Sequence, residues 1–421
     1  MPSPLLRRPV VAWALYDWAN SAFATTVMAG FFPVFFKQYW SAGTEATVST
    51  FRLGIGNGIG SFALAVLAPL IGAAADRGGA RVKTLTFFTL LGVSMTAALY
   101  WVQKGDWPLS VLFYALASVG FSGGATFADS LLLDVAEPDE LDVVSAYGYS
   151  VGYLGGGLLF AVNVWMTLSP ATFGLPDAAA AVRASFLSVA LWWAVFTLPL
   201  LLFVRERRAV APLAPLAALA AGFRELGSTL GHIRRYRTLM IFLAAFWLYI
   251  DGVNTVIKMA VDYGMSIGLE PKSLITALLL TQFVAFPAAL VFGWVGKRFG
   301  TRKGLLIAIG VYLLTTIWAY WLDSVAEFYA MAVVIGLVQG GVQSLSRSFY
   351  GRLVPPDKSG EFFGFFNLIG KFAAVVGPLL TGGVALLTGS SRVAILSLVL
   401  LFAAGGALLW LVPEAEARAE G

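Results

Sequence analysis

The stretch Trp13-Ala14-Leu15-Tyr16-Asp17-Trp18-Ala19-Asn20 places a carboxylate and an amide inside the first long apolar segment of the chain. The same spacing of Trp, Asp and Asn returns in Trp247-Leu248-Tyr249-Ile250-Asp251-Gly252-Val253-Asn254, which lies 234 positions further on (251 minus 17). A buried acidic motif that occurs once in each half predicts a chain built from two related halves. Transporters built from repeats have this organisation, with a polar site between the repeats.

The composition predicts a membrane protein. The 421 residues are 59% hydrophobic and 12% charged, whereas soluble domains are typically about half apolar and about a quarter charged. The absence of Cys and the single His232 exclude disulfides, thiolate metal sites and His clusters. The net charge of +5 is modest and does not call for a nucleic-acid partner. We find no nucleophile with a paired base and no Walker-type loop, so we expect neither an enzyme nor a cofactor.

Long apolar segments predict an all-α polytopic fold, because a membrane span needs roughly 20 mainly apolar residues. Twelve candidate spans lie near 11–36, 51–75, 84–102, 109–136, 143–168, 184–204, 239–261, 273–296, 304–322, 326–353, 361–387 and 393–412.

The longest connection, 205–237, is rich in Arg and contains an Ala/Leu-rich piece typical of an interfacial helix. It predicts an N-terminal six-helix bundle at 1–204, a cytoplasmic linker at 205–237 and a C-terminal bundle at 238–421. Roughly 19 of the 28 Lys and Arg residues would then lie on the side of the N-terminus. This bias predicts that both termini are cytoplasmic.

The loop after the second span reads Gly72-Ala73-Ala74-Ala75-Asp76-Arg77-Gly78-Gly79-Ala80-Arg81-Val82-Lys83. It resembles the Gly-xxx-Asp-Arg-x-Gly-Arg-Arg/Lys loop of the major facilitator superfamily, with Ala80 in place of the first Arg of the closing pair. The matching loop after the eighth span keeps Gly293, Arg298, Gly300 and Arg302, but Lys297 replaces the Asp. The resemblance implies two pseudo-symmetric six-helix bundles. It also implies that Asp76, Arg77, Arg81, Arg298 and Arg302 latch the inward-closed state. The alternative is a positively charged anchor with turn glycines.

One branch of this superfamily fits best. Tyr16-Asp17-Trp18-Ala19-Asn20-Ser21-Ala22-Phe23 resembles the first-span signature of the autophagy-related vacuolar effluxer family and its bacterial relatives. The stretches 147–157, 339–348 and 361–372 resemble it too, so the resemblance covers almost the whole chain. Fungal members are associated with amino acid efflux from the vacuole. The resemblance implies secondary transport around a central site, in a bacterial plasma membrane for a bacterial relative.

Polar residues within the spans are candidates for substrate binding or coupling, because an ionisable group at membrane depth usually faces a cavity or a partner. Helical spacing places Asn20 and Ser21 beside Asp17 in the first span. It places Asn254 and Lys258 on the same segment as Asp251 in the seventh. The alternative for Asp17, Asp251 and the amides is a structural hydrogen bond to a neighbouring helix. Gly152, Gly155, Gly156 and Gly157 of the fifth span predict close helix packing and bending.

The tenth span carries Gln339, Gln343 and Arg347 at successive i+4 steps, and the eleventh carries Asn367 and Lys371. Arg347 and Lys371 are the best candidates for a substrate carboxylate. Alignment of Gly123-Gly124 in span four with Gly340-Gly341 in span ten places Asp129 at about the same depth in the membrane as Arg347. This predicts an ion pair between the halves that gates the site, so that reversing both charges restores transport lost on reversing either. The alternative is pairing within one half, for instance of Arg347 with Glu361.

The sequence therefore predicts a secondary active transporter of a small solute, with an amino acid or related zwitterion as the preferred substrate. We expect alternating access and proton coupling through buried carboxylates in a monomer within the lipid bilayer. The alternative is a transporter or flippase of an amphipathic lipid or drug.

Overall fold

The computed structural model describes residues 4–44, 69–206, 236–266, 269–373 and 376–413, together with a few helical positions between 217 and 228. The predicted linker at 205–237 therefore lies largely outside the described residues.

The described chain is helical throughout. The N-terminal half comprises α1 (Arg8–Ala22), a π-helical continuation (Phe23–Phe31), α2 (Phe32–Phe35), a second π-helical stretch (Phe36–Trp40), α4 (Arg81–Ala98), α5 (Trp107–Ser130), α6 (Leu132–Val135), α7 (Leu141–Leu168) and α8 (Ala178–Phe203). The C-terminal half comprises α10 (Arg237–Ser266), α11 (Pro271–Phe299), α12 (Thr301–Trp318), α13 (Val325–Leu353), α14 (Ser359–Phe372), α15 (Val376–Thr388), α16 (Ser391–Leu396) and α17 (Val399–Trp410).

Ten helical segments within the described residues are long and apolar enough to cross a membrane. They match ten of the predicted spans and confirm an all-helical polytopic membrane protein. The predicted span at 51–75 lies mostly outside the described residues, although 69–78 is helical. The predicted span at 361–387 corresponds to two helices, α14 and α15.

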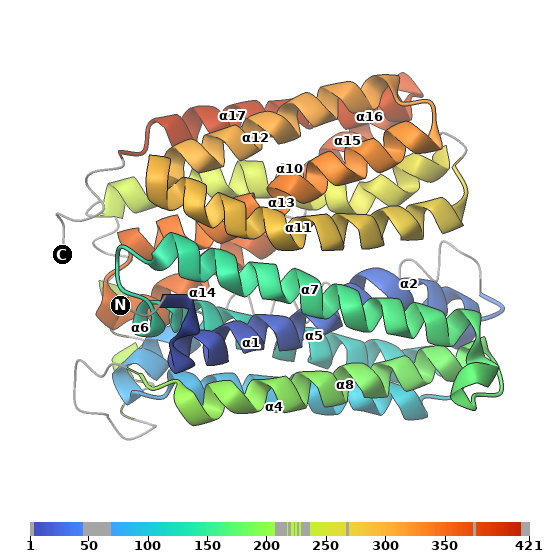
Figure 1. Ribbon diagram of the computed structural model, residues 1–421, viewed down its shortest axis with the longest axis horizontal. Helices are drawn as coiled ribbons and strands as arrows, with labels where there is room; N and C mark the ends of the chain where they lie inside the picture. The colour runs from blue at the N-terminus through green and yellow to red at the C-terminus, as the bar shows by residue number, and fades with distance from the viewer. Residues whose placement is uncertain are drawn as a thin grey trace.

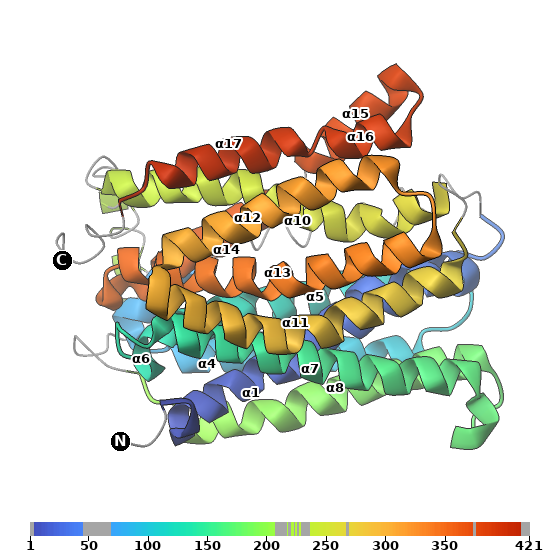
Figure 2. The same ribbon diagram turned by 45° about the horizontal axis from the view of Figure 1, so that its top comes forward.

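The long helices run alongside one another, with α1–α8 in the lower part and most of α10–α17 in the upper part of Figure 1. The start of α1 and the end of α17 lie at the same end of the bundle, which we call the terminal side; the opposite end is the far side. Figure 2 shows α14 towards the terminal side and α15 towards the far side. The eleventh span is thus divided between the two ends.

Several helices begin at a residue that caps their free backbone N–H groups. Asp106 accepts from the backbone N–H of Leu109 at the start of α5, and Asp177 accepts from that of Ala180 at the start of α8. Ser324 and Glu327 form a reciprocal capping box at the start of α13. These caps fix where the helices start.

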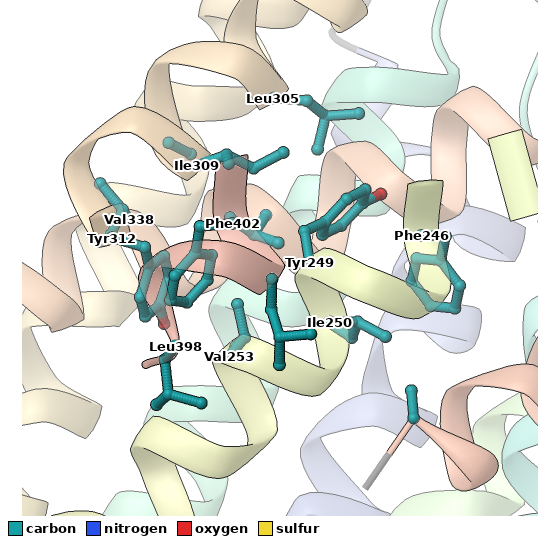
Figure 3. Packing of buried hydrophobic residues seen from close by; sticks show 14 of the residues in the cluster. Phe246, Tyr249, Ile250, Val253, Leu305, Ile309, Tyr312, Val338, Leu398 and Phe402 are labelled. Carbon is teal, nitrogen blue, oxygen red and sulfur yellow. The ribbon is translucent and has the colours of Figure 1, made fainter. Parts of the chain in front are cut away.

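Aromatic and aliphatic side chains fill the interior of the C-terminal half. Figure 3 shows Tyr249 and Val253 of α10 near Tyr312 of α12 and Phe402 of α17. The rings of Tyr312 and Phe402 stack with centroids 5.4 Å apart. Leu386 and Leu387 are among many apolar side chains left exposed on the outside, where lipid is the natural solvent.

Three of the four glycines predicted to allow close packing of α7 lie against α1, whereas a Cβ on Gly157 would lie 3.4 Å from Gln282 of α11. A Cβ on Gly152 would lie 2.8 Å from Ser21 Oγ, and one on Gly155 would lie 2.5 Å from the Trp18 ring. A Cβ on Gly156 would lie 2.8 Å from Thr25 Oγ1. This close contact brings the polar residues of α1 against the centre of the molecule.

Candidate functional site

A cavity of about 520 Å³ lies between the two halves. Along α13 its lining runs from Phe328, near the far side, to Arg347, close to the terminal side. These residues are 19 positions apart, about 28 Å along a helix axis. The wall is mostly apolar and aromatic, with Phe121, Phe246 and Phe366 among its members. Such a cavity is large enough for a drug-sized solute.

Arg347 forms the floor of the cavity and joins the two halves. Its Nη1 lies 2.9 Å from Asp129 Oδ1 of α5 and 3.0 Å from Asp17 Oδ2 of α1. Its Nη2 also donates to Asp17 Oδ2, at 3.0 Å. The predicted contact between Asp129 and Arg347 is therefore present, and Asp17 shares the same guanidinium.

The remaining donors of Arg347 bind α7. Its Nε donates to Ser145 Oγ and its Nη2 to the Ser145 carbonyl, both at 2.9 Å. Five hydrogen bonds thus use the five N–H groups of the guanidinium. The rings of Trp13 and Tyr149 lie 4.7 Å and 4.2 Å from its Cζ. A substrate carboxylate would have to displace one of these partners to bind Arg347.

Gly148 of α7 makes this cluster sterically possible. A Cβ at this position would lie 2.4 Å from Asp17 Oδ2 and 2.9 Å from Arg347 Nη2. Any other residue would therefore push the carboxylate and the guanidinium apart. We assign Gly148 as a position where the close approach of two side chains requires glycine.

Most of the predicted binding residues line this one cavity. Asn367 of α14, in the C-terminal half, donates to Asp129 Oδ2 at 3.2 Å. Tyr153 of α7, in the N-terminal half, donates to Gln343 of α13. The predicted residues that the structure brings together here are Asp17, Asn20, Ser21, Asn254, Gln339, Gln343, Arg347 and Asn367, with Asp129 beside them. The side chains of Lys258 and Lys371 lie outside the described residues.

Asp251 has a different environment from its counterpart Asp17. It is 1% exposed, and its two carboxylate oxygens each lie 3.0 Å from the backbone N of Gly377, in the first turn of α15. Thr255 also donates to it, at 3.4 Å. Asp251 thus caps a neighbouring helix, and it is not among the described residues that line the cavity. This is the structural alternative considered for the motif.

On the terminal side, the loop after the second span closes against α14. Asp76 accepts from the backbone N–H groups of Gly360 and Glu361, at 3.0 Å and 2.9 Å, where the helix N-terminus favours a negative charge. A Cβ on Gly72 would lie 2.2 Å from the Gly360 carbonyl oxygen, so only glycine fits there. Glu361 is fully buried in the same turn, and Arg77 is half-buried on the loop.

Arg81 reinforces this closure. It forms an ion pair with Asp134: Nη2 donates to Oδ1 at 3.1 Å, and Nη1 lies 2.9 Å from Oδ2. It also donates to Ser359 of α14. Burial raises the pKa of Asp76 from its usual 3.8 to about 7, and Arg81 and the two backbone N–H groups offset only part of this rise. We call Asp76, Arg81 and the start of α14 the first latch.

A second closure, also on the terminal side, lies where the loop after the eighth span meets the start of α7. Asp142, at the start of α7, accepts from Thr301 Oγ1 at 2.9 Å and from Arg352 Nη2 at 2.8 Å. Ser348 donates to the same carboxylate. We call Asp142, Thr301 and Arg352 the second latch. Lys297 stands where the loop motif has Asp, and Asp142 from the opposite half supplies the missing acid.

The two other basic residues of the second loop lie away from this closure. Arg298 is exposed, and Arg302 donates to the Val412 carbonyl at 2.8 Å, beyond the C-terminal end of α17. The Trp410 ring lies 5.9 Å from the Arg302 guanidinium. A helix C-terminus attracts a cation, which accounts for this position.

Sequence reasoning missed Asp142, Arg352 and Ser145. A signal for Asp142 was present, because an acidic segment at 137–142 is unusual on a side rich in Lys and Arg. Ser145 carries no such signal, since its role depends on a backbone carbonyl and a hydroxyl that face the neighbouring helix.

This cavity between two sets of helices, closed on one side by ion pairs that join the halves, defines a transporter rather than an enzyme, with the fold of the major facilitator superfamily. Solved structures show the same fold: FucP, a major facilitator superfamily transporter in the outward conformation, covers 97% of this chain and 100% of its own with a TM-score of 0.71 and 14% identity. The human organic anion transporter MFSD10 gives a TM-score of 0.73 at 17% identity, again over 97% of this chain and 100% of its own. The chain belongs to the family described as vacuole effluxer Atg22 like, whose model matches residues 41–421.

Relatives place the chain within this family more closely. The uncharacterized MFS-type transporter YxiO of Bacillus subtilis is 38% identical over 405 residues, which cover 96% of this chain and 94% of that protein. Autophagy-related protein 22-1 of Penicillium rubens is 27% identical over 283 residues, 61% of this chain. The chain spans about half the length (47%) of that fungal relative.

Proposed function

We propose that this protein carries an amino acid or a related zwitterion across the bacterial plasma membrane by alternating access, coupled to proton movement. The observation that carries the proposal is the cluster in which Arg347 of one half binds Asp17 and Asp129 of the other, at the floor of the cavity. A proton on either carboxylate would remove one ion pair between the halves. Protonation would therefore favour separation of the helices that close the terminal side.

Residues 1–204 and 238–421 would move as two bundles about this site, joined by the linker at 205–237. With both termini in the cytoplasm, the terminal side is the cytoplasmic side and the cavity extends towards the outside. The latches around Asp76 and Asp142 then hold the cytoplasmic side closed. Opening requires that both latches and the Arg347 cluster separate together.

The test is proton movement in proteoliposomes that contain a pH-sensitive dye, on addition of an amino acid mixture. Wild type should give a signal, and Asp17→Asn and Asp129→Asn should abolish it while the protein still melts cooperatively. Asp323→Asn is the matched control, because Asp323 is exposed and pairs with Arg392 outside the cavity. A signal unchanged by both cavity variants would refute the coupling role of the cluster.

A second candidate function is the transport of an amphipathic lipid or drug. The size and aromatic wall of the cavity favour it, since apolar bodies bind such surfaces. Movement of a spin-labelled lipid between the leaflets of proteoliposomes, together with no proton movement on addition of any amino acid, would select this alternative.

A further inference from the structure

The charges at the floor of the cavity do not balance. Two carboxylates, Asp17 and Asp129, face one guanidinium, so the cluster carries one surplus negative charge when both acids are ionised. Asp17, Asp129 and Arg347 are the charged side chains among the described residues that line the cavity. A surplus charge in a cavity with mostly apolar walls favours a cationic partner.

The surplus is located on the Asp17 side chain. Asp129 uses Oδ1 for Arg347 and Oδ2 for Asn367. Asp17 uses Oδ2 twice, for Nη1 and Nη2 of Arg347. Within the described part of the chain, Asp17 Oδ1 accepts no hydrogen bond, and the side chain lines the cavity with 15% of its surface exposed.

Arg347, in contrast, has nothing left to offer a ligand in this state. Its five N–H groups are all bonded, two aromatic rings lie against the guanidinium, and the side chain is 1% exposed. The floor of the cavity therefore presents a carboxylate oxygen to the solute, and the positive charge behind it is covered.

The walls above this oxygen suit an apolar body. Phe246, Phe366 and Phe121 line the cavity, and Tyr149 lies against the guanidinium at the floor. Aromatic faces attract cations as well as apolar groups. The wall therefore adds to the preference for a cationic head and provides contact area for a hydrophobic tail.

We propose that Asp17 Oδ1 binds a protonated amine of the solute, and that the site takes amines with an apolar body whether or not they carry a carboxylate. The inference rests on the proposed transport function and deepens it. An amino acid would bind through its ammonium group, with its carboxylate outside the Arg347 cluster. A solute that carries only a negative charge would be repelled.

The experiment measures ligand-induced thermal stabilisation of the purified full-length protein with four probes that share a phenylethyl body. These are 2-phenylethylamine, phenylalanine, 2-phenylethanol and 3-phenylpropionate, which at neutral pH are a cation, a zwitterion, a neutral molecule and an anion. We expect the amine and the zwitterion to stabilise the protein and the anion not to. Equal or stronger stabilisation by 3-phenylpropionate overturns the proposal, and so does a lack of stabilisation by both amine-bearing probes.

Two variants assign the effect to the cluster. Asp17→Asn should weaken binding of 2-phenylethylamine by about tenfold or more, because a charge-assisted hydrogen bond is lost. Asp129→Asn keeps the Asp17 carboxylate but removes the surplus charge, so it should also weaken binding of 2-phenylethylamine. Asp323→Asn should bind like wild type. Unchanged amine binding in both cavity variants contradicts the proposal, even if one of them is poorly stable.

Failure of this inference is distinguishable from failure of the proposed function. Binding of amines that depends on Asp17, without any solute movement in proteoliposomes, would refute transport and leave the site standing. Solute movement without any preference for amines would refute the cation site and leave transport standing.

Discussion

Arg352 at the end of α13 binds Asp142 at the start of α7 through two hydrogen bonds, with Nη1 2.9 Å from Oδ1 and Nη2 2.8 Å from Oδ2. This pair joins the halves on the terminal side, as Asp76 and α14 do in the first latch. In the first latch the acid belongs to the loop and contacts the opposite helix. In the second the acid belongs to the opposite helix and contacts the loop. The same closure is thus built with the partners exchanged.

Loss of the second latch should shift the protein towards a state open on the terminal side. Asp142→Asn keeps the shape of the side chain but removes the charge that binds Arg352. Leu133 of α6 packs against the hydrophobic interior of the N-terminal half and against that of the C-terminal half, so it becomes more accessible when the halves separate. Because the chain has no Cys, Leu133→Cys provides a single reporter thiol. We expect its labelling by an impermeant maleimide to rise about tenfold in Asp142→Asn, a shift of about 1.4 kcal/mol.

The control for this measurement is Asp323→Asn in the same Leu133→Cys background, since that exposed ion pair lies away from both latches. Labelling that is equal in Asp142→Asn and in the control would show that the second latch does not hold the halves together.

Removal of Arg347 alone should destabilise the protein more than removal of the whole cluster. Arg347→Gln leaves two buried carboxylates facing each other, and breaking one side of a buried ion pair typically costs about 3–5 kcal/mol. The triple variant Asp17→Asn, Asp129→Asn, Arg347→Gln leaves neutral groups that can still bond. We expect its melting temperature in detergent to recover most of the loss, without recovery of transport. A triple variant less stable than Arg347→Gln would contradict this account.

Asp251 should prove to be a structural residue despite its place in the repeated motif. Asp251→Ala removes the cap of α15 and should cost about 1–2 kcal/mol of stability, seen as a lower melting temperature. Asp251→Asn keeps an acceptor for the Gly377 N–H and should retain proton-coupled transport. Loss of proton movement in Asp251→Asn, with the melting temperature intact, would instead give Asp251 a part in coupling.

The folded state should lose stability as the pH rises through neutrality, because Asp76 becomes ionised while buried. The pKa of Asp76 is raised to about 7 from its usual 3.8, because the side chain is buried. A raised pKa means that the folded state holds the proton more tightly. The resulting stability is fully present below pH 3.8 and is lost as the pH rises through 7. Between pH 6 and pH 8 the loss is about 1.4 kcal/mol.

The measurement is the free energy of unfolding at pH 6 and pH 8, for wild type and for Asp76→Asn. Wild type should lose stability relative to the variant, whose amide does not titrate. A difference between the two proteins that stays constant from pH 6 to pH 8 would show that Asp76 does not titrate in this range.

Much of this architecture follows from the sequence because apolar length and turn glycines are local properties. The spans, the loop at 72–83 and the contact of Asp129 with Arg347 could be predicted from hydropathy and from alignment of the halves. The sharing of Arg347 with Asp17 could not, because it depends on the rotation of α1 about its axis and on the space left at Gly148. A double reversal of Asp129 and Arg347 would therefore place a new carboxylate beside Asp17, and rescue should be incomplete.

The repeated Trp-Asp-Asn motif does not predict the role of Asp251, because its two copies have different neighbouring helices. Helical periodicity places Asp251 and Thr255 on one face, but it does not say which helix that face meets. The neighbour is α15, whose free N–H groups take up the carboxylate. Asp142 escaped prediction for a related reason: its partners come from α12 and α13 of the opposite half, so no local pattern connects them.

The division of the eleventh span into α14 and α15 has a mechanical consequence. Asp251 fastens the start of α15 to α10, whereas Asp76 fastens the start of α14 to the opposite half. A tilt of α14 that releases Asp76 can therefore leave α15 bound to α10. The terminal-side helix of this span can then be released while its far-side helix keeps its contact with the C-terminal half.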